Sequence, residues 1–196
     1  MTFTNTWFEI TAQANFEKYI KPLADKGRIM NFLEIGCYEG RASVWLMENT
    51  GSKLTVIDTF LGSKEHDSQF EKTLLARFRE NIYPYKDRVE VLKGTSSDQL
   101  KSIKFSHLPM TELFDFIYVD GSHQASDVLE DAILAFPLLK ENGIMIFDDF
   151  TWGQGMSPYD VPATGINAFL FVYANQLRTL EKNTQVIIRK TMTPEA

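Results

Sequence analysis

The chain has 196 residues and a formal net charge of −6, and the 44% hydrophobic and 23% charged residues are typical of a soluble, single-domain globular protein. No stretch approaches the roughly 20 apolar residues of a membrane span, and the first residues lack the pattern of a secretion signal. Scattered basic residues argue against a nucleic-acid partner, and a single cysteine excludes an internal disulfide and favours the cytoplasm.

Apolar periodicity predicts strands that alternate with helices along the chain. In chain order we expect a helix or helix pair over 7–25, strand 30–35, helix 41–49, strand 54–57, helix 70–82, strand 89–92, helix 97–103, strand 116–119, helix 125–140, strand 143–147, helix 163–174 and strands 177–181 and 185–189. The last two strands flank a short turn and predict a closing hairpin. This order is typical of an α/β fold with a doubly wound, mostly parallel, seven-stranded sheet and a C-terminal antiparallel hairpin.

A glycine turn follows the first expected strand. Glu34, Gly36 and Gly40 are spaced E-x-G-x-x-x-G, whereas dinucleotide-binding folds carry G-x-G-x-x-G there. Glycines let the backbone approach a ligand closely, and an acid on the strand suits an amino group better than a diphosphate. Asp58 ends the second strand, where a carboxylate can accept hydrogen bonds from a ribose diol. An ordinary strand–helix connection also uses glycine, but the four residues together favour a cofactor site.

The stretch over residues 114–150 contains two apolar strands that each end in acid. Asp120 follows the first strand, and Asp148 and Asp149 follow the second. The strands of a strand–helix–strand unit are parallel, so these acids are expected to meet at the carboxyl edge of the sheet, where ligands bind. Three close carboxylates repel one another unless a proton or a cation intervenes. The alternative is that they are cap and solvated strand-end residues.

One geometric condition applies to the acid pair. Consecutive side chains on a regular strand face opposite ways. Asp148 and Asp149 can therefore share one ion only if the strand ends or bends at this point, which the Pro- and Gly-containing loop over residues 151–162 allows.

With these motifs the chain resembles class I S-adenosylmethionine-dependent methyltransferases from about residue 30 to its end. EIGCYEG (34–40) looks like their first motif, IDTF (57–60) like their second and FDFIYVDG (114–121) like their fourth strand. The resemblance implies their Rossmann-like sheet and S-adenosylmethionine as cofactor. Tyr38 departs from the glycine of many members, a departure that small-molecule O-methyltransferases often share. The cofactor-binding residues that the resemblance implies are Glu34, Gly36, Cys37, Tyr38, Gly40, Asp58, Thr95, Ser96, Ser97 and Asp120.

The second half resembles metal-dependent O-methyltransferases of the sugar-modifying kind, such as those acting on macrolide sugars, and more distantly catechol and caffeoyl-CoA O-methyltransferases. D-G-S-H at 120–123, followed after a helix by D-D at 148–149, carries this resemblance. It implies that Asp120, Asp148 and Asp149 hold Mg²⁺ or another divalent cation, which prefers such oxygen ligands. Asp120 and His123 are the implied catalytic residues. His123 is expected to remove the acceptor hydroxyl proton, and a surface histidine at a helix start is the alternative.

These expectations divide the single domain into an N-terminal helical cap (1–28), a cofactor and metal half (30–150) and a closing loop, helix and hairpin (151–196). Two histidines outside the motifs carry weaker expectations. His66 is expected in a polar loop that either moves freely or covers the substrate together with Phe60, and His107 is expected at the surface.

Three aromatic residues are candidates for an apolar acceptor wall, because ligand pockets favour aromatic side chains. They are Trp7, Trp152 and Tyr159, and ordinary packing is the alternative role.

The expected function is a cytoplasmic, S-adenosylmethionine-dependent and Mg²⁺-dependent O-methyltransferase that acts on a hydroxyl of a sugar or glycan. A catechol-like phenol is the alternative acceptor. The expected partner is a small-molecule or glycan acceptor, with no nucleic acid and no membrane, and self-association into a homo-oligomer is left open. Two rivals belong to other classes, a nicotinamide-dependent oxidoreductase and a catalytically silent cofactor-binding or partner module. The absence of G-x-G-x-x-G argues against the first, and the complete set of acids with His123 argues against the second.

Overall fold

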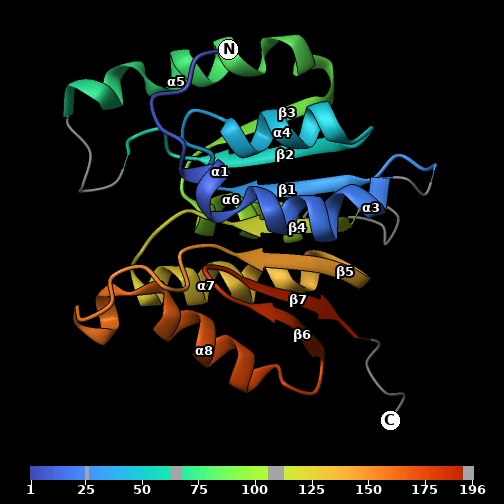
Figure 1. The fold of residues 1–196 in the computed structure, drawn as a ribbon, viewed down its shortest axis with the longest axis vertical. Helices are drawn as coiled ribbons and strands as arrows, with labels where there is room; N and C mark the ends of the chain where they lie inside the picture. The colour runs from blue at the N-terminus through green and yellow to red at the C-terminus, as the bar shows by residue number, and fades with distance from the viewer. Residues whose placement is uncertain (25–26, 63–67, 106–112, 192–196) are drawn as a thin grey trace.

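A seven-stranded sheet forms the centre of the structure (Figure 1). The computed structural model describes residues 1–24, 27–62, 68–105 and 113–191. The strand order is β3-β2-β1-β4-β5-β7-β6, parallel from β3 to β5, with β7 antiparallel to both of its neighbours. The strands are β1 (Asn31–Ile35), β2 (Lys53–Asp58), β3 (Val89–Lys93), β4 (Phe114–Val119), β5 (Leu139–Phe147), β6 (Leu177–Lys182) and β7 (Val186–Lys190).

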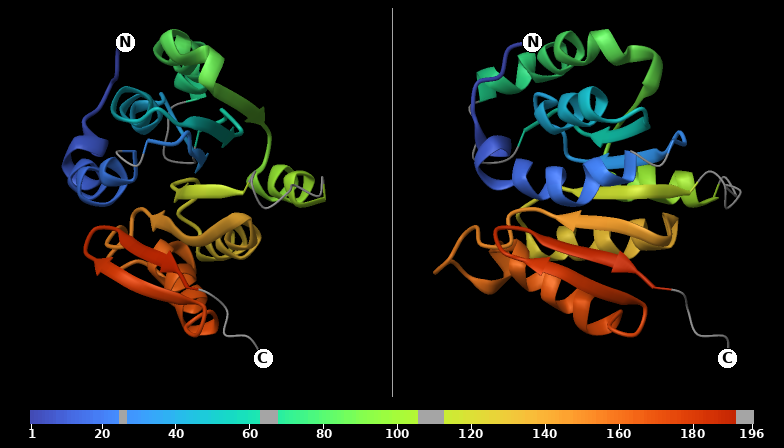
Figure 2. Two further views of the ribbon diagram at one scale, coloured as in Figure 1. Left: turned by 90° about the vertical axis from the view of Figure 1, so that its right-hand side faces the viewer. Right: turned by 45° about the vertical axis from the view of Figure 1, so that its right-hand side comes forward.

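Helices cover both faces of the sheet (Figure 2). The first face carries α1 (Trp7–Thr11), α2 (Gln13–Asn15), the π-helical turn η1 (Phe16–Ile20), α3 (Lys21–Ala24), α4 (Arg41–Asn49) and α5 (Ser68–Ile82), which the 3₁₀ turn η2 (Tyr83–Arg88) follows. The second face carries α6 (Ser96–Phe105), α7 (Ala125–Ala135) and α8 (Pro162–Val172), with the 3₁₀ turns η4 (Phe136–Leu138) and η5 (Pro158–Asp160). Within the described residues, no helix is long and apolar enough to cross a membrane.

The N-terminal segment packs directly against the first face of the sheet. Phe16 is fully buried, and its ring meets those of Trp45, Phe116 and Tyr118 edge to face at centroid distances of 5.5, 5.6 and 5.0 Å. Such aromatic pairs contribute about 0.5–1.5 kcal/mol each beyond the area they bury. This cluster therefore fixes the N-terminal helices to α4 and to β4.

The second face is held by α7 and α8, which approach each other closely. Phe169 of α8 packs against Phe136 and against Phe147 of β5, with ring centroids 5.3 and 5.4 Å apart. At Gly165 an added Cβ atom would lie 2.3 Å from the carbonyl oxygen of Ala125, so a side chain there would push the helices apart. This contact fixes the start of α7, and the loop that leads into it contains Asp120 and His123.

The strand order reverses at β1 and β4. The connection after β1 leads to α4 on the first face, and the connection after β4 leads to α7 on the second. In open α/β sheets, ligands bind at such a point, beyond the carboxyl ends of the strands. The fold therefore places the glycine turn and Asp120 side by side at the expected ligand edge.

The seven strands and the fold class predicted from the sequence are confirmed, and the main difference lies before β5. The helix expected to reach Lys140 ends at Ala135 and continues as a 3₁₀ turn that contains Pro137. Proline has no amide hydrogen to donate and clashes with the preceding helical turn. The strand then begins at Leu139 rather than at residue 143, through an irregular segment in which Asn142 has a positive φ of 62°.

Candidate functional site

The glycine turn after β1 lies in contact with the loop after β4. Gly36 has a φ of 80°, and a Cβ atom added there would lie 2.1 Å from the carbonyl oxygen of Asp120. Its amide donates to Ile57 O (2.8 Å), and the amide of Asp120 donates to Ile35 O (2.8 Å). Only glycine accommodates both this φ and this approach. The turn thereby aligns the carboxyl ends of β2, β1 and β4.

Asp58 braces the same turn. Its Oδ2 accepts hydrogen bonds from the amides of Cys37 (2.8 Å) and Tyr38 (3.1 Å), and its Oδ1 accepts one from the amide of Phe60 (2.6 Å). An ionised carboxylate offers about four acceptor sites. Asp58 therefore holds the turn and retains capacity for one more donor, so its contact with a ribose hydroxyl stays a prediction.

Glu34 lies beneath the turn. It is 1% exposed, and its Oε2 accepts a hydrogen bond from Ser43 of α4. Burial raises the pKa of Glu34 to about 8, against the lowering effect of the Ser43 hydrogen bond. In this arrangement its partner is Ser43, and the predicted contact with the amino group of a cofactor is untested. Burial likewise raises the pKa of the Cys37 thiol well above its usual range.

Tyr38 takes an unusual backbone conformation in the turn. Its φ is 51°, a left-handed value that favours glycine, while Gly40 (φ 83°) forms the N-cap of α4. The ring of Tyr38 lies 5.6 Å from that of Trp7, centroid to centroid. Trp7 is thus placed beside the glycine turn.

The segment after β3 approaches this edge as well. The amide of Gly94 donates to the carbonyl oxygen of Asp58 (3.0 Å), and Thr95 Oγ1 exchanges hydrogen bonds with Asp98 at the start of α6. Ser97 Oγ donates to Glu130 of α7 (2.7 Å). The predicted cofactor-binding residues Thr95, Ser96 and Ser97 therefore lie next to Asp58, on a helix start tied to α7.

The three acids follow the neighbouring carboxyl ends of β4 and β5. The amide of Asp148 donates to Val119 O (3.0 Å), next to Asp120. The strand ends at Phe147, and Asp149 has a positive φ of 56°. The bend required for two consecutive acids to serve one site is therefore present.

The electrostatics of the acids favour a proton or a cation. Burial, and then the neighbouring charge of Asp149, raises the pKa of Asp148 to about 6. Asp120 exposes its side chain to solvent but is closely surrounded by protein atoms, which, with the charges of Asp148 and Asp149, raise its pKa well above the usual range. Among the described residues, no lysine or arginine forms an ion pair with these acids. Carboxylates in such surroundings gain stability from a bound cation.

The donor chemistry suits a hard divalent ion, but the side chains are not gathered around one point. Among the described residues, no three His, Cys, Asp or Glu side chains are grouped to hold a metal ion. Asp148 is turned toward Tyr118, whose hydroxyl donates to its Oδ2, and its Oδ1 accepts the amide of Asp149. Asp149 is paired with His123. Because His123 faces Asp149 Oδ2, a cation would bind Asp149 through its other oxygen, Oδ1.

His123 lies between an acid and an aromatic ring. Its Nε2 is 2.9 Å from Asp149 Oδ2, and its ring centroid is 4.0 Å from that of Trp152. A carboxylate partner orients an imidazole and favours its protonated form. The pair could therefore accept and hold a proton at the edge where Asp120 lies.

The remaining candidates are distributed unevenly. Trp152 lies beside His123 and Trp7 beside Tyr38, while Tyr159 is 69% exposed, so the structure does not gather the three into one wall. Phe60 is buried against Phe78. His66 and His107 lie outside the described residues.

Sequence reasoning missed the buried polar residues behind Asp148. Tyr118, Gln185 and Asn15 are at most 6% exposed and form hydrogen bonds in series. The sequence offered one weak signal, the hydroxyl of Tyr118 inside an otherwise apolar strand. Asn15 and Gln185 are 170 positions apart, and no local pattern connects them.

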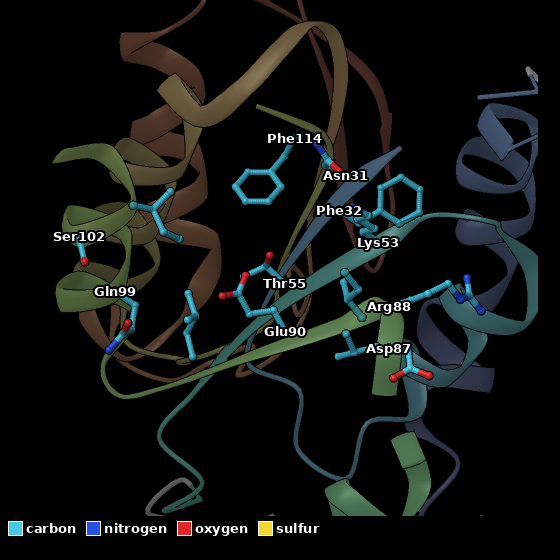
Figure 3. A pocket seen from close by; sticks show the side chains of 14 residues that line it. Asn31, Phe32, Lys53, Thr55, Asp87, Arg88, Glu90, Gln99, Ser102 and Phe114 are labelled. Carbon is cyan, nitrogen blue, oxygen red and sulfur yellow. The ribbon is translucent and has the colours of Figure 1, made fainter. Parts of the chain in front are cut away.

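A cavity lies at the opposite edge of the sheet (Figure 3). It measures about 650 Å³ and is lined by the first residues of β1 to β4 (Asn31, Lys53, Val89 and Phe114) and by residues of α6. The predicted site residues follow the carboxyl ends of the strands, so this cavity is separate from them.

Comparison with known proteins agrees with this geometry. A family model described as a methyltransferase domain matches residues 33–150. The uncharacterized protein R132 of Acanthamoeba polyphaga mimivirus is 27% identical over 135 residues, which cover 68% of this chain and 57% of that protein.

Solved structures of O-methyltransferases share the fold. MycE from the mycinamycin biosynthetic pathway, in complex with Mg, SAH (S-adenosylhomocysteine) and mycinamycin VI, has a TM-score of 0.63 at 16% identity, covering 99% of this chain and 52% of its own. An O-methyltransferase from Bacillus cereus in complex with SAH has a TM-score of 0.62 at 21% identity, covering 94% and 88%. TomG from Streptomyces achromogenes, in complex with SAM (S-adenosylmethionine), has a TM-score of 0.66 at 21% identity, covering 92% and 82%. The chain thus spans about half the length of MycE and of R132.

Proposed function

Because this chain belongs to the methyltransferase-domain family, we propose that it is an S-adenosylmethionine-dependent, Mg²⁺-dependent O-methyltransferase that acts on a hydroxyl of a sugar or glycan. Membership confirms the class predicted from the motifs at the level of the methyltransferase domain. The oxygen acceptor, its sugar nature and the metal belong to the proposal.

The His123–Asp149 pair beside Asp120 carries the proposal. Transfer of a methyl group to a hydroxyl forms a carbon–oxygen bond, breaks a carbon–sulfur bond and releases the hydroxyl proton. S-adenosylmethionine would supply the electrophilic methyl group, and a divalent cation would acidify and orient the hydroxyl. His123 would accept the proton at the nitrogen that does not face Asp149, while Asp149 stabilises the resulting imidazolium.

The cofactor would be held by the turn residues. Gly36 allows backbone approach, Asp58 has one acceptor site left for a ribose hydroxyl, and the segment from Thr95 to Ser97 lies beside Asp58. Asp120, Asp148 and Asp149 are the residues that would hold the cation. The raised pKa values of Asp120 and Asp148, and the lack of Lys or Arg ion-pair partners for the three acids within the described chain, support this assignment.

A vicinal diol suits bidentate chelation, which supports a sugar acceptor and leaves a catechol-like phenol as the alternative. The complex of MycE with Mg, SAH and mycinamycin VI supports the metal and a natural-product acceptor by analogy of fold. A cytoplasmic location, a small-molecule or glycan partner without nucleic acid or membrane, and self-association remain parts of the proposal. Localisation imaging and light scattering test the first and the last.

The deciding experiment compares wild type with His123→Asn in methyl transfer to a panel of sugars, glycans and phenols. General-base catalysis contributes about 10²–10⁴-fold, so kcat should fall by that factor. The affinity for S-adenosylhomocysteine, measured by calorimetry, should change less than twofold. A wild type inactive toward every hydroxyl acceptor, or a His123→Asn variant with full kcat on an accepted one, would contradict this function or this role.

Ligand binding separates the proposal from its rivals. An oxidoreductase would bind a nicotinamide dinucleotide, whereas we expect calorimetric binding of S-adenosylhomocysteine and none of NAD. A silent module would bind the cofactor but transfer no methyl group. Inhibition of transfer by EDTA and its recovery with Mg²⁺ test the metal dependence.

A further inference from the structure

A series of buried polar side chains runs from the N-terminal segment to Asp148. Asn15 Nδ2 donates to Gln185 Oε1 (2.8 Å), Gln185 Nε2 donates to Tyr118 Oη (3.4 Å), and the Tyr118 hydroxyl donates to Asp148 Oδ2. All four residues are at most 9% exposed. Burial of polar groups opposes folding unless their hydrogen bonds are satisfied, and this series ends on an acid of the candidate site.

The series includes the turn between β6 and β7, which also contacts the backbone beside the acid pair. The amide of Phe150, the residue after Asp149, donates to the carbonyl oxygen of Thr184 (2.9 Å). Asn15 Nδ2, which donates to Gln185 Oε1, also donates to Asn183 Oδ1 (3.2 Å). The N-terminal segment and the closing hairpin thus meet behind the site. The hairpin contacts the site through the Gln185–Tyr118 hydrogen bond and through the bond between Thr184 O and the Phe150 amide.

These contacts fix the Asp148 carboxylate without exhausting it. Oδ2 accepts the Tyr118 hydroxyl and Oδ1 accepts the Asp149 amide (2.8 Å). An ionised carboxylate has about four acceptor sites. With the further hydrogen bond that the Gln185 side chain contributes, at least one site remains for a ligand. Proteins usually orient a metal-binding side chain by hydrogen bonds from the residues that lie behind it.

We propose that Asn15, Gln185 and Tyr118 are positioning residues that hold the Asp148 carboxylate in the orientation that binds a divalent cation. The proposal rests on the metal dependence of the proposed function. It adds that the N-terminal segment and the closing hairpin, which contain none of the expected metal ligands, set the affinity for the cation.

Tyr118→Phe isolates the hydroxyl, because the ring can keep its packing against Phe16 and Phe116. Mutation of such outer partners usually weakens metal binding about 10–100-fold. We expect a weakening of this size in calorimetric titration with Mn²⁺, and an affinity for S-adenosylhomocysteine within twofold of wild type. Titrations are done at a temperature at which the metal-free variant has the far-UV circular dichroism of wild type.

Tyr19→Phe is the matched control. It also removes a tyrosine–carboxylate hydrogen bond, from Tyr19 Oη to Glu181 (2.6 Å), but does so away from the acids. Its Mn²⁺ affinity should equal that of wild type. If Tyr118→Phe binds Mn²⁺ with an affinity within twofold of wild type, the positioning role is wrong, although the metal site itself stands.

Gln185→Met tests whether the series acts as one unit. We expect a smaller loss of Mn²⁺ affinity in the wild-type background and no further loss in the Tyr118→Phe background, since coupled residues are not additive. If the losses of Mn²⁺ affinity in the two variants add fully, Gln185 and Tyr118 do not act as one unit, and the proposed series is wrong. If wild type binds no Mn²⁺ and Asp148→Asn changes nothing, both the metal dependence and this inference are wrong, which distinguishes that failure from the others.

Discussion

Gly36 is the residue where the backbone of the site leaves no room for a side chain. Gly36→Ala places a methyl group 2.1 Å from the carbonyl oxygen of Asp120 at a φ of 80°. The positive φ costs about 1–2 kcal/mol, and overpacking against backbone adds about 1–3 kcal/mol. We expect the free energy of unfolding in urea to fall by at least ~2 kcal/mol, with loss of S-adenosylhomocysteine binding.

Gly51→Ala is the control for that substitution. Gly51 has no atom within 4 Å of an added Cβ and precedes the neighbouring strand β2. Its effect should stay within about 0.5 kcal/mol, as at other unconstrained surface positions. Equal losses in the two variants would show that the contact between Gly36 and Asp120 is not what the turn depends on.

The three acids show which features of the site could be predicted from residue type and which could not. Asp120, Asp148 and Asp149 could be assigned to one edge because each follows an apolar strand. The left-handed backbone conformation of Asp149 could not be predicted, because non-glycine residues seldom adopt it and tertiary contacts enforce it. Glu34 was placed correctly on its strand, but its partner Ser43 lies on the next helix, and the strand pattern alone left that choice open.

Between helices α6 and α7, one buried acid predicts a pH-dependent contact. Burial raises the pKa of Asp131 to about 7, partly offset by a hydrogen bond from Ser96. The unfolded chain releases this proton near pH 4, so between about pH 4 and 7 the folded state holds one proton more. Wild type therefore loses stability as pH rises through that window.

Asp131→Asn should remove this contribution. The difference in unfolding free energy, variant minus wild type, should rise by up to ~1.4 kcal/mol per pH unit between about pH 4 and 7 and then level off. Urea denaturation at several pH values measures it. A flat difference across the window would show that Asp131 ionises in the folded state as it does in the unfolded chain.

Glu130→Gln, on the same helix, tests a contribution to stability with the opposite dependence on pH. Hydrogen bonds from Ser97 and Lys101 lower the pKa of Glu130, so its stabilising contribution is present above the pKa of the unfolded chain and is lost as pH falls. The variant should therefore be less stable than wild type at neutral pH, with a difference that stays flat between about pH 5 and 7.

At the scale of elements, the order of strands and helices was predictable because each element carries its own periodicity. The start of β5 was not predictable, because Leu139 and the polar residues 140–142 match neither a strand nor a helix pattern. Pro137 was the available signal for an earlier helix end.

At the scale of the molecule, the contacts between distant segments escaped prediction. The β6–β7 turn looked like a plain hairpin closure in the sequence, yet Gln185 is completely buried and bonded to Asn15. Contacts across 170 positions leave no trace in a single sequence unless one partner is unusual in its own surroundings. The positioning of Asp148 therefore depends on the complete fold.

Cooperative unfolding tests whether the two faces of the sheet form one unit. Phe16 anchors the N-terminal segment on the first face, and Phe169 anchors α8 on the second; both are fully buried. Truncation of a buried phenylalanine to alanine costs about 3–5 kcal/mol. If the chain is one domain, Phe16→Ala and Phe169→Ala should each shift a single thermal transition, seen identically by circular dichroism and by tryptophan fluorescence.

Phe171→Ala is the control. Its site is 86% exposed on the same helix as Phe169, so it should leave the transition in place. Two separate transitions, or a shift in one probe alone, would show that the N-terminal segment unfolds independently of the sheet.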